Sequence, residues 1–249
     1  MTEQQQAGPG AVDGAGGSPE VPVASSRPVA GYGVDGAAEH PGVAQLFAVL
    51  AGGEILAFER LAKEAELAPD LRGRIAFASM AAAEMAHFET LQGELERRGL
   101  EVVAVTEPYL EVLARYHART TPRNWYEALV KAYIGDGLAA DFYTQVLPAL
   151  PAGAAAVVEE TLSGTGHSEF VVPQVRSAVV ANPALRSPLT LWGRRLLSEA
   201  ITQAQEVLAT RDELTDMLFA SAADVAGIAD FFETAQNHHA KRMAALGLG

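Results

Sequence analysis

Apolar residues recur every three or four positions along most of the chain after about residue 38, and this period predicts α-helices. The first helix is expected from about Gly42 to Glu66 and the second from about Pro69 to Arg98. Each helix has one apolar face that should be buried. The first face contains Val43, Phe47, Leu50, Glu54, Phe58 and Leu61, and the second contains Phe77, Met80, Glu84, His87, Leu91 and Leu95.

The same pattern continues to the end of the chain, so the predicted fold class is all-α. Val102–Val105 is expected to be extended or irregular, Pro173 should kink its helix, and Thr210-x-x-Glu213 resembles a capping box. The last helical region is expected to break near Ser221–Asp224. The later helices are expected at Glu107–His117, Thr121–Leu147, Gly153–Val180, Ser187–Ala209 and Thr210–Leu246.

Residues 1–38 have a different composition from the rest. They are rich in Gly, Pro, Ala, Ser and Gln and show little apolar periodicity. Such a segment cannot bury enough apolar surface to fold, so we expect a disordered tail over residues 1–38 and one helical domain over residues 39–249.

Two side chains on the second buried face are candidate metal ligands. Glu84 and His87 are three residues apart, which places them on one face of a helix. A charge on a buried face is unfavourable unless it is paired or bound to a metal. An inward-facing Glu-x-x-His motif is what a di-iron or di-manganese site takes from two helices of a four-helix bundle, while the other two helices give one carboxylate each.

Hairpin geometry adds three further candidates. Glu54 and Glu84 are equally far from Pro69, the predicted turn, so they should lie at one level of an antiparallel helix pair. Asp136 and His167 are likewise symmetric about the predicted turn at Pro151. The predicted metal ligands are therefore Glu54, Glu84, His87, Asp136 and His167.

Each candidate has an alternative explanation without metal. Glu54 also suits a salt bridge at the edge of the core. Asp136 lies between two glycines and can mark a helix irregularity, and His167 can be a hydrogen-bonded core histidine. The remaining histidines are expected at the surface and not as ligands: His40, His117, His238 and His239.

Composition narrows the chemistry. The chain has no cysteine, which excludes disulfides, thiolate zinc sites and cysteine nucleophiles. Carboxylate and imidazole ligands together suit iron or manganese. The net charge of -13 disfavours sequence-independent binding of nucleic acid, which depends on Lys and Arg. No signal peptide is recognised and no apolar run is expected to span a bilayer, so we expect a cytoplasmic protein without a membrane partner.

Three segments resemble the ferritin-like di-iron proteins that include the tRNA 2-methylthio-isopentenyladenosine hydroxylases, the MiaE-like group. The resemblance covers about residues 42–180 and rests on the segments 53–61, 80–88 and 164–170. It implies a ferritin-like four-helix bundle with additional C-terminal helices. It also implies that Glu54 binds one metal and Glu84 bridges, that His87 completes the first site, and that Asp136 and His167 belong to the second.

The sequence departs from this family at two places. Asp136 is one methylene shorter than the usual glutamate, and Gly164 stands where the second Glu-x-x-His would have its acid. The second metal site is therefore expected to be weak, open or absent. Glu160 lies on the same face as His167. At ~1.5 Å per residue, however, it is about 10 Å away along the helix axis.

The resemblance implies a non-haem di-iron oxidase or hydroxylase that activates O2 within the bundle. Its substrate would be a small molecule or a tRNA, its electron donor is unknown, and a homodimer is expected. Two alternatives remain, a metal-depleted bundle that serves as a binding or interaction module, and an iron-storing ferroxidase. The aromatic side chains expected near the pocket, each of which also suits an ordinary core, are Phe58, Phe88, Tyr133, Phe142 and Tyr143.

Overall fold

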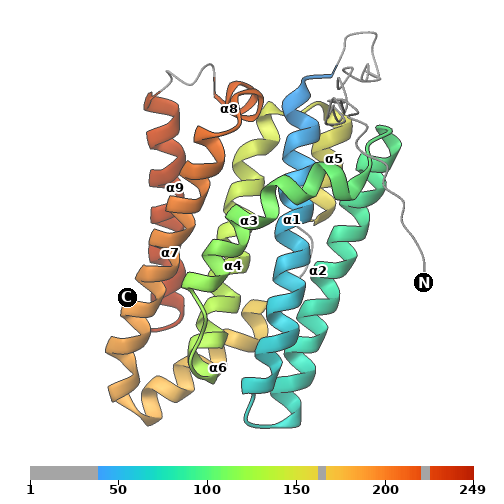
Figure 1. Ribbon diagram of the computed structural model, residues 1–249. Coiled ribbons are helices and arrows are strands. Elements are labelled where there is room, and N and C mark those ends of the chain that lie inside the picture. Colours follow the sequence, from blue (N-terminus) through green and yellow to red (C-terminus); the bar gives the residue numbers. More distant parts are fainter. Residues whose placement is uncertain (1–38, 162–166, 220–224) are drawn as a thin grey trace, which may run out of the picture. The chain divides into compact units, whose positions relative to one another are not determined.

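The computed structural model describes residues 39–161, 167–219 and 225–249, and over these ranges it contains helices and no strand (Figure 1), so the all-α prediction is confirmed. Short 3₁₀ turns follow α1, α4 and α6. The helices are α1 Pro41–Glu64, α2 Leu71–Arg97, α3 Val102–Arg119, α4 Trp125–Val146, α5 Ala152–Thr161, α6 His167–Ala181, α7 Arg186–Ala209, α8 Asp212–Leu218 and α9 Val225–Ala245.

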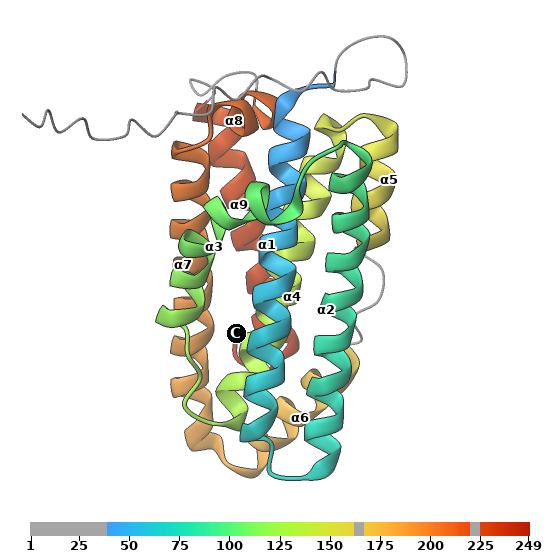
Figure 2. The same ribbon diagram turned by 45° about the vertical axis from the view of Figure 1, so that its right-hand side comes forward.

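The antiparallel pair of α1 and α2 is one side of the bundle and carries the candidate ligands (Figures 1 and 2). The turn between them forms as expected, but α2 begins at Leu71 and not at Pro69. Asp70 is its N-cap, and its side chain accepts a hydrogen bond from the Gly73 N–H at 2.8 Å. Most of both predicted apolar faces is buried, with Phe58 and His87 partly buried. Helix α4 contacts α1, α5 and α6, and α5 contacts α2.

Helix α3 corrects the prediction for Val102–Val105, which is helical and not extended. The Glu101 carboxylate caps its first turn by accepting from the N–H groups of Val103 and Ala104 at 3.0 and 2.7 Å. Residues 102, 105, 106 and 109 then share one inward face, because their spacing has the helical period. This face packs across α1, as Figure 2 shows.

Two predicted helix starts were also wrong. Helix α4 begins at Trp125 with Asn124 as N-cap, whereas the Thr121 hydroxyl donates to carbonyls at the end of α3. The Thr210-x-x-Glu213 capping box does not form, since the Thr210 hydroxyl donates to the Glu206 carbonyl and Glu213 accepts from Gln45. In both cases the hydroxyl bonds to the last turn of the preceding helix, which competes with capping the next one.

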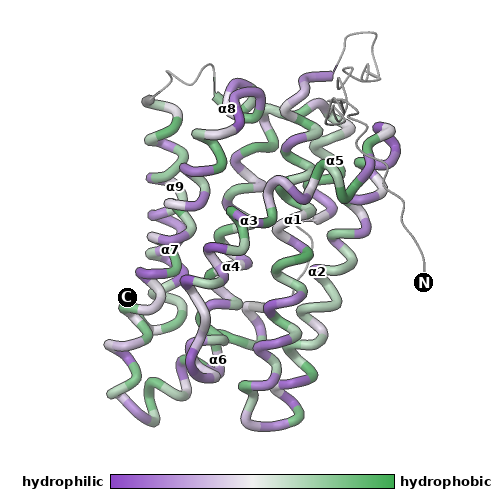
Figure 3. Tube along the Cα trace, viewed as in Figure 1, coloured by the Kyte–Doolittle hydropathy of each residue, from purple (hydrophilic) through white to green (hydrophobic). Residues whose placement is uncertain are grey.

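The predicted helix over Gly153–Val180 corresponds to α5 and α6, and α6 continues through Pro173. Its middle part, residues 162–166 with Gly164, lies outside the described residues, as do the tail at residues 1–38 and the expected break at Ser221–Asp224. Figure 3 shows hydrophobic and hydrophilic segments alternating along the helices, which is typical of amphipathic helices around a core.

The prediction that no apolar run is long enough to span a bilayer was wrong by length and composition alone. The segment Pro41–Leu67 is long and apolar enough to cross a membrane by length and composition. However, 56% of its most apolar window is buried inside the protein, and the core helix of a soluble bundle has the same property. This segment contains Glu54, whose side chain points into the bundle and not to its outside.

Candidate metal centre

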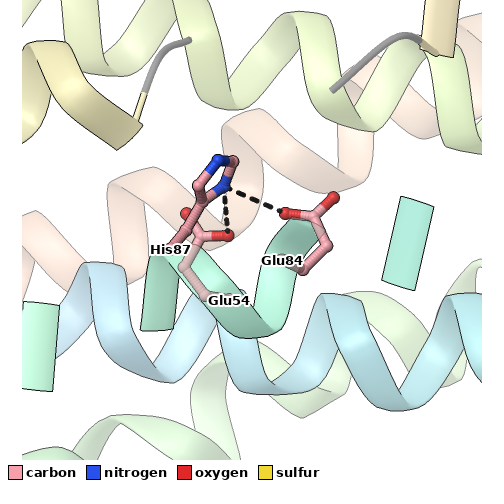
Figure 4. Close-up of side chains that lie close together, drawn as sticks. All are labelled: Glu54, Glu84 and His87. Atoms are coloured by element: carbon pink, nitrogen blue, oxygen red, sulfur yellow. Dashed lines mark ion pairs between the residues drawn. The ribbon is translucent and has the colours of Figure 1, made fainter. Parts of the chain in front are cut away.

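Helices α1 and α2 bring three of the five predicted ligands together. Glu54 comes from α1, and Glu84 and His87 come from adjacent turns of α2. One potential ligand atom from each residue lies within 4.8 Å of the others. The His87 Nδ1 atom is 3.6 Å from a Glu54 oxygen and 3.7 Å from a Glu84 oxygen (Figure 4).

The position of the cluster follows from the local sequence. The ligand-type residues occupy inward positions between Leu50 and Leu61 on α1 and between Met80 and Leu91 on α2, and these four apolar side chains are buried. Glu54 and Glu84 are therefore carried into the core, where they are 5% and 7% exposed. A carboxylate so placed requires a proton, a cation or hydrogen-bond donors.

Tyr143 of α4 supplies one such donor. Its hydroxyl donates to the Glu54 carboxylate, and both groups are buried. Burial raises the pKa of Glu54 to about 7, and burial also raises the pKa of Tyr143 well above its usual value. The phenol therefore keeps its proton and fixes one Glu54 oxygen, which leaves the other oxygen facing His87.

His87 balances the charge of the cluster in the protein without metal. The neighbouring carboxylates, Glu54 first and then Glu84, raise the pKa of His87 to about 10. Two carboxylates and one imidazole that converge in a buried site are also a donor set that a divalent iron or manganese ion accepts. The three residues therefore fit one such ion, which would replace the imidazole proton.

The other two predicted ligands have different outcomes. Asp136 lines the same cavity as the cluster, but it is not part of the three-residue group found among the described residues. His167 is the first residue of α6, and its side chain lies outside what the structure describes. Gly164 lies outside it as well, so the composition of a second metal site remains a prediction.

The cluster lies in the wall of a cavity of about 660 Å³, to which α1, α2, α3, α4, α7 and α9 all contribute side chains. Phe142 and Tyr143 line this cavity, whereas Phe58, Phe88 and Tyr133 pack against the apolar core. Much of the remaining wall is aliphatic or aromatic, so the cavity suits an apolar ligand with a small polar part. Apolar residues of the wall include Val49, Leu50, Leu113, Leu138 and Phe231.

A second group of polar side chains in the same wall was not predicted: Arg60, Tyr116, His117 and Lys131. His117 lines the cavity and its Nδ1 atom is buried, and His239 is 5% exposed, so the expectation that these two histidines lie at the surface was wrong. The signal that could have been used is Lys131, which interrupts the apolar run from Leu129 to Ala132.

Two of the other histidines have partners that the sequence did not suggest. His40 is exposed, as expected, and its Nδ1 accepts from the Gly42 N–H at the start of α1. His238 is half-buried, with its Nδ1 2.8 Å from an Asp141 oxygen. Neither histidine lies in the wall of the cavity.

Comparison with known proteins agrees with the helical bundle. A family model described as "Ferritin-like domain, actinomycetes" matches residues 38–221, which includes α1 to α8 and all five predicted ligands. No curated protein matches the chain. Because the match covers well over half of the sequence, the chain belongs to this ferritin-like domain family of actinomycetes.

Proposed function

We propose that this protein is a non-haem iron oxidase or hydroxylase that acts on a small molecule. The proposal is carried by one observation, the buried convergence of Glu54, Glu84 and His87 in the wall of a largely apolar cavity. Asp136 and His167 are proposed as ligands of a second ion, as the family resemblance implies. Manganese would be accepted by the same donor types.

The residues of the chain have distinct tasks in this proposal. Glu54 and Glu84 hold the ion with their carboxylates, and His87 completes the set with its imidazole. Tyr143 donates to Glu54 and fixes the carboxylate that it contacts, and such contacts tune the affinity of a metal site. Bound iron supplies the chemistry of O2 activation, for which the surrounding apolar wall excludes water.

Cavity size and charge favour a small substrate over a tRNA. Sites for small molecules typically enclose roughly 300–1000 Å³. The cavity of this protein, at about 660 Å³, lies well inside that range. A tRNA, which the MiaE-like resemblance implies, would require a basic surface, and the chain has a net charge of -13. The proposal also includes an external electron donor and a homodimeric protein.

One observation favours a second candidate function, a bundle that binds ligands without metal chemistry. The His87 imidazole lies near both carboxylates, which raise its pKa to about 10, and a protonated His87 would bring the cluster close to charge balance without an ion. Such a protein would use the same cavity but would not consume O2.

The test is anaerobic loading of the purified protein with Fe(II), followed by addition of O2 in the presence of a reductant. We expect an iron-dependent optical change and O2 uptake, both of which His87→Ala should lose. The exposed Glu89→Gln, on the opposite face of α2, is the matched control and should behave like the wild type. Tight iron binding without O2 uptake would contradict the oxidase, and a normal response of His87→Ala would contradict the assigned site.

A further inference from the structure

The second polar group of the cavity contains more positive than negative charge. The Arg60 Nη1 is 2.9 Å from Glu64 Oε2, and the Lys131 Nζ is 3.3 Å from Glu64 Oε1. One carboxylate thus lies between a guanidinium and an ammonium. Glu199 of α7 forms an ion pair with Arg119 instead, at 3.4 Å.

The side chains of Arg60 and Lys131 are both buried. The side chain of Lys131 is 2% exposed and that of Arg60 is 9% exposed. Together they carry more N–H donors than the single Glu64 carboxylate can accept. A buried cation with unused donors is unfavourable by itself, and its retention requires a partner or a function.

Neutral polar atoms next to the cations also lack partners. The Tyr116 hydroxyl and the His117 Nδ1 are buried and have no hydrogen-bond partner within the part of the chain that the structure describes. The Lys131 Nζ lies 5.9 Å from the centroid of the Tyr116 ring, which places these groups side by side. Arg60, Tyr116, His117 and Lys131 all contribute to the wall of the cavity.

The separation between this group and the candidate metal ligands follows from helix geometry. Arg60 comes six residues after Glu54 on α1, and Lys131 comes twelve residues before Tyr143 on α4. At ~1.5 Å per residue, these spacings correspond to about 9 Å and about 18 Å along the helix axes. The wall between the two groups contains apolar side chains such as Leu113 and Leu138.

We infer that Arg60 and Lys131 form a binding site for the carboxylate of an amphiphilic acid, whose apolar body extends through the cavity toward Glu54 and Glu84. The carboxylate would accept hydrogen bonds from the guanidinium and the ammonium, as the Glu64 carboxylate does, and one from the Tyr116 hydroxyl. Glu64 shows that the two cations already have the spacing that one carboxylate requires. The anionic end is thereby held away from the metal ligands, so a C–H bond of the apolar body lies nearest to them. Oxidation of the bound acid rests on the proposed function, whereas binding of the acid does not.

The experiment is isothermal titration of the full chain with decanoate and with decanol, in the presence of a chelator so that no metal contributes. The extended decanoate chain is comparable in length with the separation between the two groups. We expect decanoate to bind more tightly than decanol. Lys131→Met should weaken decanoate binding about tenfold, as expected for the loss of one charge-assisted hydrogen bond, and leave decanol binding unchanged.

A second variant gives a change of the opposite sign. Glu64→Gln removes the competing anion while it keeps the shape of the side chain, so decanoate should bind several-fold more tightly. Arg115→Met is the matched control, because Arg115 is a partly exposed cation of α3 that does not line this cavity. Arg115→Met should bind both ligands like the wild type.

Equal affinity for decanoate and decanol in the wild type, or no binding of either, would overturn the inference. Unchanged decanoate binding in both Lys131→Met and Glu64→Gln would overturn it as well. Decanoate selectivity in a protein that binds no iron would contradict the proposed function alone. Iron binding without decanoate selectivity would contradict this inference alone.

Discussion

Lys131→Met should make the protein more stable. The lysine is fully inside the bundle, and burial lowers its pKa from 10.5 to about 8, although the neighbouring Glu64 carboxylate acts in the opposite direction. This lowering corresponds to about 3 kcal/mol of unfavourable free energy for the charged form in the folded state. Methionine has a similar volume and no charge, so the substitution removes that cost.

The expected gain in the free energy of unfolding is reduced because Lys131→Met also removes one partner of Glu64. Removal of one member of a buried ion pair is strongly unfavourable when the other member is left alone. Here Glu64 keeps Arg60 at 2.9 Å, so its charge remains compensated. We therefore expect a net gain of about 2 kcal/mol, which is a rise of about 4–8 °C in Tm for a chain of this size.

The pH dependence follows from the direction of the shift. Between pH 8 and pH 10.5 the unfolded lysine binds a proton that the folded one has released, so wild-type stability gains from this group as the pH rises. The advantage of Lys131→Met should be full below pH 8 and should disappear toward pH 10.5. Thermal unfolding at pH 7 and at pH 10, followed by circular dichroism, measures both quantities.

Glu64→Gln is the contrasting variant for this assay. It leaves the guanidinium of Arg60 and the ammonium of Lys131 buried without a carboxylate, and should destabilise the protein by about 3 kcal/mol. A loss of stability in Lys131→Met at pH 7, or a gain that does not change with pH, would refute the argument that Lys131 is retained at a cost to stability.

Three further substitutions test other parts of the structure. Tyr143→Phe removes the donor to Glu54 and should weaken Fe(II) binding about tenfold or more, as measured by competition with a chelator. Burial lowers the pKa of His239 to about 4. Wild-type stability should therefore fall as the pH falls from 6.5 to 4, by at most about 3 kcal/mol, and urea unfolding of His239→Gln should lack this decrease. Phe77→Ala removes a fully buried ring whose centroid lies 4.7 Å from that of the tilted Trp125 ring. That substitution should cost about 3–5 kcal/mol in the same assay.

The pairing of α1 with α2 could be predicted from the sequence because two independent features agree. The apolar period defines the buried face of α1 and α2, and the turn near Pro69 defines which residues lie at the same level. Together they indicated that Glu54 would meet Glu84 and His87, and the structure has these three side chains in one cluster. Ends of helices were less predictable, since the hydroxyls of Thr121 and Thr210 can bond backward as well as cap the next helix.

The cation group could not be predicted in the same way. Glu64 lies at the end of α1, Lys131 lies within α4, and no spacing along the sequence relates them. Their pairing depends on how α4 packs against the α1–α2 pair, which is a tertiary property. His117 illustrates the same limit, because it lies in the last turn of α3 and lines a cavity that several helices form together.

The central claim is that Glu54, Glu84 and His87 bind a metal ion, and its most direct test is elemental analysis after anaerobic Fe(II) loading and desalting. We expect at least one iron per chain in the wild type and in the exposed Glu89→Gln, and almost none in Glu84→Gln. Two irons per chain would support the second site with Asp136 and His167. A folded wild-type protein that retains no iron, or a Glu84→Gln variant that retains as much as the wild type, would contradict the account.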